Sequence, residues 1–461
     1  MVYKKFNKFE LTLAIILSVS IILFYFFFNL NYLTKWIDEK YDCTTYDYYV
    51  RLGLPQYLFN PHHIGFDWLG ERMFDFLKKN GYTGSSMIVL QLRNLIVSSI
   101  GLGILFFLLY KISKKIYLSL LIIAMIAFSC AFWLYSQIND TPIIHSVLLV
   151  LLFMMTIYYP DAKRKYLFSI LLGIFHSIVV FFHQSDLIFM VVIFFVYIFS
   201  DYLLNKFKTF YQRDIPFLKN NPFQNYFSFS NLKFFIVYFI TFSIIVASAY
   251  YFVGIVLIGL TLDITKATDF NKIKGASYFF NWLVLYSKID YWGKGFSDTN
   301  LLEKVLTGIS TYFYQPQSFN GDKLQFNWNN FFHPSSILPN FIGLLFMIVF
   351  SITFLFFKKL FDKYNFVFIA NIIFLVIYTI FSCWWEPDYR EFWVATMFPF
   401  WLLTFFIFNF IIDHGNNFKP LLIFFIYGFL NIFVMLLFYF NFYGYMIQYA
   451  GKEFRVFDII K

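Results

Sequence analysis

The sequence is short of charged residues. Only 13% of its 461 residues are charged, whereas an average soluble domain carries about 25%. In their place, 60% of the chain is hydrophobic, and apolar runs of about 20 residues, the length that crosses a bilayer core, recur along the whole chain. This composition excludes an ordinary soluble domain. It predicts an all-α fold, a polytopic transmembrane helical bundle.

Cysteine is also scarce, and the usual cofactor motifs are missing. Cys43, Cys130 and Cys383 form neither a disulfide framework nor a zinc-type pair. Cys43 and Cys383 are expected on the same side of the membrane, and a bond between them remains open. No glycine-rich nucleotide-binding loop is present. The net charge is +10, but basic residues at helix ends set membrane topology, so we expect no nucleic-acid partner.

The apolar runs predict about eleven spans in a single transmembrane domain that covers residues 1–461. We expect the spans at about 11–30, 87–110, 116–135, 142–158, 167–182, 187–204, 234–260, 337–357, 366–383, 393–412 and 421–440. Two long connections, at 31–86 and 261–336, separate them. The second contains an apolar run at 277–286 that is too short to cross a bilayer and is expected to lie in the interface.

Basic clusters predict the orientation of the bundle. Lysine and arginine gather just after residues 110, 162 and 357, and the positive-inside rule places such short connections in the cytoplasm. The N-terminus is then inside, the C-terminus is outside, and both long connections lie on the outer face. Acidic residues gather on that face, which indicates a site there. We expect a multi-pass protein of a bacterial inner membrane, surrounded by membrane lipids, with its first span retained.

The first long connection carries a helical pattern of its own. Apolar residues recur at helical spacing from Phe66 to Leu77, whereas Asp67 falls on another face. Lys78 and Gly81 suit the end of a helix. The pattern predicts an amphipathic helix at the outer membrane interface, on which Asp67 is expected to contribute little to a site.

The same connection contains the densest group of residues suited to chemistry. The group comprises Asp42, Asp47, Tyr46, Tyr49, His62 and His63. A carboxylate here can act as general base on an acceptor hydroxyl, or can hold a divalent cation. Aromatic faces beside carboxylates suit a sugar, whose hydroxyls need acceptors and whose C–H face packs on rings. The alternative, a loop that merely carries solvating charge, stays open.

Other outer turns and one span add further candidates. They are Asp140 after the third span, His183, Gln184 and Asp186 after the fifth, Glu386 and Arg390 after the ninth, and Arg93 within the second. Arg390 is the only basic residue of its turn, and a guanidinium grips phosphate through two parallel hydrogen bonds. An ionisable group within a span is a functional candidate. The alternatives are helix capping at Asp140, a plain polar turn at His183 and reach toward lipid headgroups at Arg93.

These features together resemble the GT-C superfamily of glycosyltransferases, integral membrane enzymes that use polyprenyl-phosphate sugars. In that family an acid follows the first span, an amphipathic helix comes next, and a second acid sits in the outer turn between spans three and four. Asp42, with Asp47 behind it, and Asp140 stand at those places. The stretches 60–63 and 391–393 also look like those of bacterial members. One departure is that Asp42 is followed by Cys43 and not by a second acid.

The resemblance implies a reaction and its partners. A polyprenyl-phosphate sugar would reach the outer face, and Asp42 or Asp47 would deprotonate the hydroxyl of a lipid or glycan acceptor of the cell envelope. Attack at the anomeric carbon would release the lipid phosphate, held by basic residues such as Arg390, with inversion. A divalent cation is one option as cofactor. Two alternatives stay open: a transporter or flippase of a lipid-linked or anionic solute, and an envelope polysaccharide polymerase or ligase.

Overall fold

The computed structural model describes residues 5–30, 33, 42–199, 229–262, 278–283, 295–297, 299–314, 327–364, 366–387, 390–414 and 419–442. This part of the chain is helical, and its one extended pairing is a single bridge between Thr261 and Tyr278. The α-helices are α1 (Lys8–Leu30), α2 (Asp42–Leu52), α3 (Pro55–Leu58), α4 (Phe66–Lys79), α5 (Ser86–Ser113), α6 (Ile116–Phe128), α7 (Cys130–Tyr135), α8 (Pro142–Thr156), α9 (Lys165–Phe182), α11 (Phe229–Tyr251), α12 (Phe279–Leu283), α13 (Leu301–Ser310), α14 (Ile337–Leu355), α15 (Phe357–Tyr364), α16 (Phe366–Trp385), α17 (Glu391–His414) and α18 (Lys419–Asn441).

Eight helices in the described residues are long and apolar enough to cross a membrane. They are α1, α5, α9, the segment that begins with α11, α14, α16, α17 and α18. The prediction of a multi-pass helical membrane protein is confirmed at this level. Three shorter apolar helices, Ile116–Phe128, Pro142–Thr156 and Gln184–Phe199, occupy the other places where spans are expected. The total of about eleven spans stays a prediction.

Helix α17 forms the centre of the bundle. In its most apolar stretch of 18 residues, 94% of the residues are buried. This is the pattern of a helix that is hydrophobic on all sides and surrounded by protein. It packs against α6, α8, α14, α15, α16 and α18. Pro399 lies inside it, and Asn371 of α16 donates a hydrogen bond to the Pro399 carbonyl at 2.9 Å.

The third predicted span is not one continuous helix. It breaks at Ser129, whose backbone is extended (φ −65°, ψ 143°), into α6 and α7. The backbone N–H of Ala131 donates instead to the Thr311 carbonyl at 2.9 Å. Thr311, the residue after α13, thus accepts a hydrogen bond from an N–H group that would bond within the helix if the helix were unbroken. The seventh predicted span also changes character near its end, where 252–257 winds as a π-helix.

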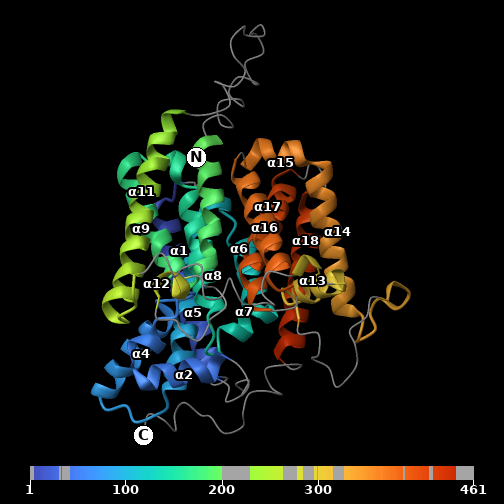
Figure 1. The fold of residues 1–461 in the computed structure, drawn as a ribbon. Helices are drawn as coiled ribbons and strands as arrows, with labels where there is room; N and C mark the ends of the chain where they lie inside the picture. Colours follow the sequence, from blue (N-terminus) through green and yellow to red (C-terminus); the bar gives the residue numbers. More distant parts are fainter. Residues whose placement is uncertain are drawn as a thin grey trace.

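The bundle has α15 at one end and α2 and α4 at the other (Figure 1). The end at α15 is rich in basic residues. The basic end is defined by Lys111, Lys114, Lys115, Lys163, Arg164, Lys165, Lys358, Lys359 and Lys363. There Lys114 pairs with Glu10 at 2.6 Å, and Lys115 pairs with Asp413 at 2.5 Å. These ion pairs tie the start of α1 to α5, and the end of α17 to the connection after α5. Helices α2 and α4 lie at the opposite end, which carries the candidate site.

The helix predicted from Phe66 is present as α4, but its buried side differs from the expectation. Asp67 is fully buried, whereas Phe76 is 66% exposed. The reason is that α4 approaches α5 through Gly70, where an added Cβ would stand 2.2 Å from a Leu90 methyl carbon and 2.9 Å from a guanidinium nitrogen of Arg93. Gly70 and Asp67 therefore face the protein, whereas Phe76, on the apolar side of the predicted helix, faces outward.

Candidate functional site

The turn that carries the histidine pair of the first connection is fixed to the end of α9. Within the turn, the His62 N–H donates to the Asn60 side chain at 2.9 Å. The His62 carbonyl accepts the Gln184 N–H at 2.7 Å, and the Gly65 N–H donates to the Phe181 carbonyl at 2.8 Å. Backbone bonds from two distant parts of the sequence thus set the position of this turn.

Four histidines from three segments gather beside this junction. We call His62, His63, His145 and His183 the histidine cluster. The centroids of the His62 and His183 rings are 4.2 Å apart, and the His183 ring stacks on His145 at 4.5 Å. His63 lies next to His62, with ring centroids 6.2 Å apart. The first connection, the start of α8 and the junction after α9 therefore meet at one place.

A buried carboxylate anchors the inner side of the cluster. Asp186 is fully buried and lies in the 3₁₀ segment η2 (Gln184–Phe189). One of its oxygens is 3.1 Å from His145 Nδ1, and the other accepts a hydrogen bond from the Tyr378 hydroxyl at 2.9 Å. Its backbone carbonyl is 2.9 Å from His176 Nε2. Both charged oxygens are therefore bonded, which a buried carboxylate requires.

Burial keeps the histidine pair of the first connection neutral. Burial first, and then the charge of neighbouring His145, lowers the pKa of His62 to about 4. Burial and the neighbouring His62 lower the pKa of His63 to about 3. An unperturbed histidine titrates near pH 6.5, so both rings are uncharged at pH 7. They offer hydrogen-bond donors and acceptors, and the positive charge of the site must come from arginine.

Aromatic rings form the walls around these imidazoles. Trp385, at the end of α16, stacks parallel to His62 with centroids 6.2 Å apart, and Phe392 meets the His183 ring edge-on at 6.3 Å. On the other side Tyr46 contacts His63 edge-on, and its hydroxyl is 3.3 Å from His63 Nε2. Neutral polar groups thus alternate with aromatic faces.

Arg93 joins the cluster to the turn that follows the third predicted span. Its side chain is 1% exposed, so it does not reach toward headgroups. The guanidinium lies 3.7 Å above the Phe66 ring, donates to the Phe66 carbonyl at 2.6 Å, and donates to the Asn139 side chain at 3.4 Å. Asp67 is its acidic neighbour, and one Asp67 oxygen is 4.0 Å from His63 Nδ1.

The two acids expected from the family resemblance belong to neighbouring segments. Asp42 is the first residue of α2, and the carbonyl of Cys43 accepts a hydrogen bond from the Asn139 side chain at 3.0 Å. This bond brings the first turn of α2 against the 136–140 turn. Asp140 accepts the N–H of Thr141 at 2.6 Å. Thr141 is the N-cap of α8 and makes no side-chain capping bond, so Asp140 does not cap this helix.

Asp47 and Tyr49 lie on other parts of α2. The Asp47 carboxylate accepts a hydrogen bond from Ser86, the first residue of α5, and pairs with Arg51 at 3.0 Å. A negative group at a helix N-terminus is stabilising, so Asp47 fastens α2 to α5. Tyr49 stacks on Tyr57, the neighbouring aromatic of α3, with ring centroids 5.3 Å apart.

The remaining predicted residues lie on the rim. Gln184 bonds His62 through its backbone and reaches the Leu283 carbonyl of α12 at 3.4 Å. Glu386 is half-buried and follows Trp385 directly. Arg390 is half-buried and lies near Cys130. Among the residues that the structure describes, no ion pair joins Arg390 to an acidic side chain.

Some of the predicted residues converge and others do not. His62, His63, His183, Tyr46 and Gln184 contact one another directly or through one neighbour. Asp47 and Tyr49 make their contacts elsewhere on α2. Asp186 was one of the candidates after the fifth predicted span, but its partners His145 and Tyr378 were not predicted from the sequence. A histidine within a predicted span was the available signal for His145, because ionisable groups in spans are rare and functional.

Metal and disulfide chemistry find little support in this part of the chain. Among the residues that the structure describes, no three or more His, Cys, Asp or Glu side chains are arranged to hold a metal ion. Cys43, Cys130 and Cys383 form no disulfide, so the bond between Cys43 and Cys383 that the sequence left open is not present in the structure.

No protein-family model matches the chain, and no curated protein matches it. The function is therefore inferred from the geometry of this site.

Proposed function

We propose that this protein is a membrane glycosyltransferase of GT-C type, which moves a sugar from a polyprenyl-phosphate donor to an envelope acceptor on the outer face of the membrane. One observation carries the proposal. Segments far apart in sequence converge at the end of the bundle opposite the basic end, and they build a site of neutral imidazoles, aromatic walls and buried arginine. The positive-inside rule places that end outside.

The groups present match the three parts of such a substrate. Neutral histidines and Gln184 can exchange hydrogen bonds with sugar hydroxyls. The donor's phosphate needs a cation, and Arg390 supplies a half-buried guanidinium with no described acidic partner. Donor and acceptor would meet at the junction of α2 with the 136–140 turn.

In this reaction Asp42 is the general base, with Asp47 as the reserve candidate. The carboxylate takes the proton of the acceptor hydroxyl as the oxygen forms its bond to the anomeric carbon. The bond between that carbon and the donor's phosphate oxygen breaks, and the phosphate leaves with the electron pair. Arg390 stabilises the charge that develops there. Asp140 lies in the turn next to α2, close to the same junction.

The deciding experiment measures sugar transfer from a radiolabelled polyprenyl-phosphate sugar in vesicles that contain the purified protein and a lipid extract of the envelope as acceptor. Loss of a general base costs about 10²–10⁴-fold in rate. Asp42→Asn should therefore abolish detectable transfer, at unchanged abundance in the membrane. Asp75→Asn is the matched control, because Asp75 lies on the exposed side of α4 and pairs with surface Lys79 at 2.7 Å.

Each other outcome is informative. A dead Asp47→Asn beside an active Asp42→Asn would move the base five residues along the chain. Full activity in both variants would remove the enzyme interpretation of this connection. Movement of labelled lipid across the bilayer without transfer would favour the transporter alternative.

A further inference from the structure

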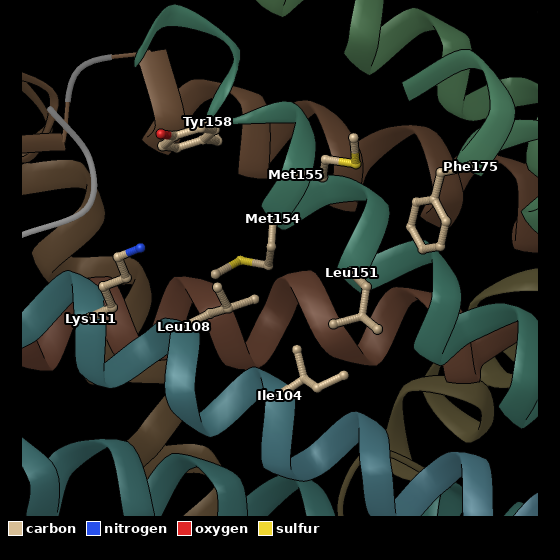
Figure 2. A pocket seen from close by; sticks show the side chains of 8 residues that line it. All are labelled: Ile104, Leu108, Lys111, Leu151, Met154, Met155, Tyr158 and Phe175. Atoms are coloured by element: carbon tan, nitrogen blue, oxygen red, sulfur yellow. The ribbon is translucent and has the colours of Figure 1, made fainter. Parts of the chain in front are cut away.

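A groove lies near the basic end, away from the histidine cluster. It is a cavity of about 340 Å³ between α5, α8 and α9 (Figure 2). Lys111, near the end of α5, is 18 residues beyond Arg93, which corresponds to about 27 Å along a helix axis. The groove and the candidate catalytic site are therefore at opposite ends of the same helices.

The lining of the groove is polar at one end and apolar along the rest. Figure 2 shows the Lys111 ammonium and the Tyr158 ring on one side, with Leu108, Leu151 and Phe175 continuing away from them. An ammonium and a phenol beside a run of aliphatic and aromatic side chains match a molecule with an anionic head and a hydrocarbon tail.

The groove opens sideways, toward the surface that lipid covers. Ile104 and Tyr158 at its edge are 40% and 39% exposed, whereas Met154 at its floor is 1% exposed. Methionine side chains adapt to irregular partners, and both Met154 and Met155 line this space. A flexible chain can therefore enter from the bilayer without unfolding any element.

The charges around the polar end are uneven. Lys114 and Lys115 are paired with Glu10 and Asp413, whereas Lys163 and Arg164, just after α8, are exposed. Lys111, Lys163 and Arg164 outnumber the one acid of this turn, Asp161, so this edge of the basic end carries a net positive charge. A positive edge attracts anionic headgroups, by about 1 kcal/mol for each Lys or Arg near the membrane surface.

We propose that this groove binds one anionic phospholipid of the inner leaflet. Its phosphate is held by Lys111 and Tyr158, and one acyl chain lies along Leu108, Leu151 and Phe175. The tail of a polyprenyl-phosphate donor is a poorer fit. The only anionic group of that donor is its phosphate, which would lie at the candidate catalytic site, whereas the cation of the groove, Lys111, lies at the opposite end.

The test uses the full-length protein, purified and stripped of lipid in detergent. Three probes with matched detection are added back: phosphatidylglycerol, phosphatidylcholine with the same acyl chains, and polyprenyl phosphate without sugar. Bound lipid is counted by native mass spectrometry. We expect phosphatidylglycerol to bind about fivefold more tightly than phosphatidylcholine, the factor that one lysine contributes.

Two variants separate the headgroup from the chain. Lys111→Gln should lower phosphatidylglycerol binding about fivefold, to the level of phosphatidylcholine, because only the charge is lost. Ile104→Trp should block both phospholipids by filling the mouth of the groove. Lys78→Gln and Leu171→Trp are the matched controls, since Lys78 and Leu171 are exposed and do not line the groove, and Lys78 lies on α4, at the opposite end of the bundle.

The result that overturns the proposal is equally plain. Unchanged phosphatidylglycerol binding in both Lys111→Gln and Ile104→Trp would show that lipid binds only at the general surface. Polyprenyl phosphate that displaces phosphatidylglycerol from the wild type, and that is itself lost in Ile104→Trp, would assign the groove to the tail of the donor.

Discussion

Two arginines near the candidate site stand in contrasting surroundings. Arg93 is enclosed, with its guanidinium over Phe66 and bonded to two other segments. Arg390 is half-buried and makes no ion pair with a described acid. Losing Arg93 would remove the hydrogen bond to the buried Phe66 carbonyl and the positive charge that acts on Asp67, which costs stability. Arg390, which we propose holds the donor's phosphate, should be replaceable with little cost to the fold.

The prediction at this scale is that Arg390→Ala lowers transfer from the polyprenyl-phosphate donor by at least about tenfold, since a hydrogen-bonded charge contributes about 1.5–3 kcal/mol. Arg390→Lys should recover only part, because an ammonium cannot make the paired bonds of a guanidinium. The measurement is initial rate against donor concentration, with exposed Arg72→Ala as control. A normal rate in Arg390→Ala would place phosphate binding elsewhere, with Arg93 next.

The neutral histidines make stability depend on pH. The pKa of His62 falls to about 4 and that of His63 to about 3 in the folded protein, against about 6.5 when unfolded. Below pH 6.5 these two histidines bind protons in the unfolded chain but stay neutral in the folded protein until the pH reaches about 4. The contribution of the two neutral rings to the free energy of unfolding is therefore complete above pH 6.5, and it is lost as pH falls toward 4.

We expect the thermal unfolding temperature of the protein in detergent to fall steadily between pH 6.5 and pH 4.5. His63→Gln should flatten that fall, because glutamine has no proton to take up. Each histidine contributes at most about 1.4 kcal/mol for each pH unit. His333→Gln, at an exposed position, should keep the wild-type slope. Equal slopes in all three proteins would mean that these rings are accessible to protons.

At the scale of elements, close helix contacts decide the packing more than the hydrophobic pattern does. Gly173 of α9 meets α11 so closely that an added Cβ would stand 2.9 Å from the Tyr238 carbonyl oxygen. That neighbour is backbone and cannot rotate away. Gly428 of α18 also lies within an apolar helix, but nothing is within 4 Å of the Cβ position.

This contrast gives a matched pair of substitutions. Gly173→Ala should lower the free energy of unfolding by about 1–3 kcal/mol, because α9 and α11 must separate to admit a methyl group. Gly428→Ala should be neutral or stabilising by up to about 1 kcal/mol, because alanine favours helix over glycine. Unfolding in detergent by a graded denaturant measures both. Equal effects would show that the α9–α11 crossing is looser than the structure has it.

At the scale of the whole molecule, the two ends of the bundle are predicted to face opposite sides of the membrane. A reporter enzyme that works only outside the cytoplasm should be active when fused after Lys461, and inactive when inserted at Lys163. A tag placed at Tyr82, in the connection between α4 and α5, should be reached by reagents that do not cross the membrane. A fusion at Lys461 that is active only in the cytoplasm would reject the odd number of spans.

The sequence by itself determined the class of the protein and the position of most helices. Apolar runs longer than a bilayer core can form nothing but buried or lipid-facing helices, because every backbone polar group must then bond internally. Helix α4 was likewise predicted from a spacing of apolar residues, which depends only on local geometry. The break at Ser129 was not predicted, because it depends on the Thr311 carbonyl from another part of the chain.

Only the tertiary structure decided which polar residues share a site. The sequence placed His62 and His183 in separate connections, and their ring contact follows from bonds between the backbones of two distant turns. The sequence also predicted that Asp67 contributes little to a site, but Asp67 is buried because Gly70 lets α4 approach α5. Burial, ring contact and pKa are properties of a packed interior, and they arise when helices far apart in sequence exclude water together.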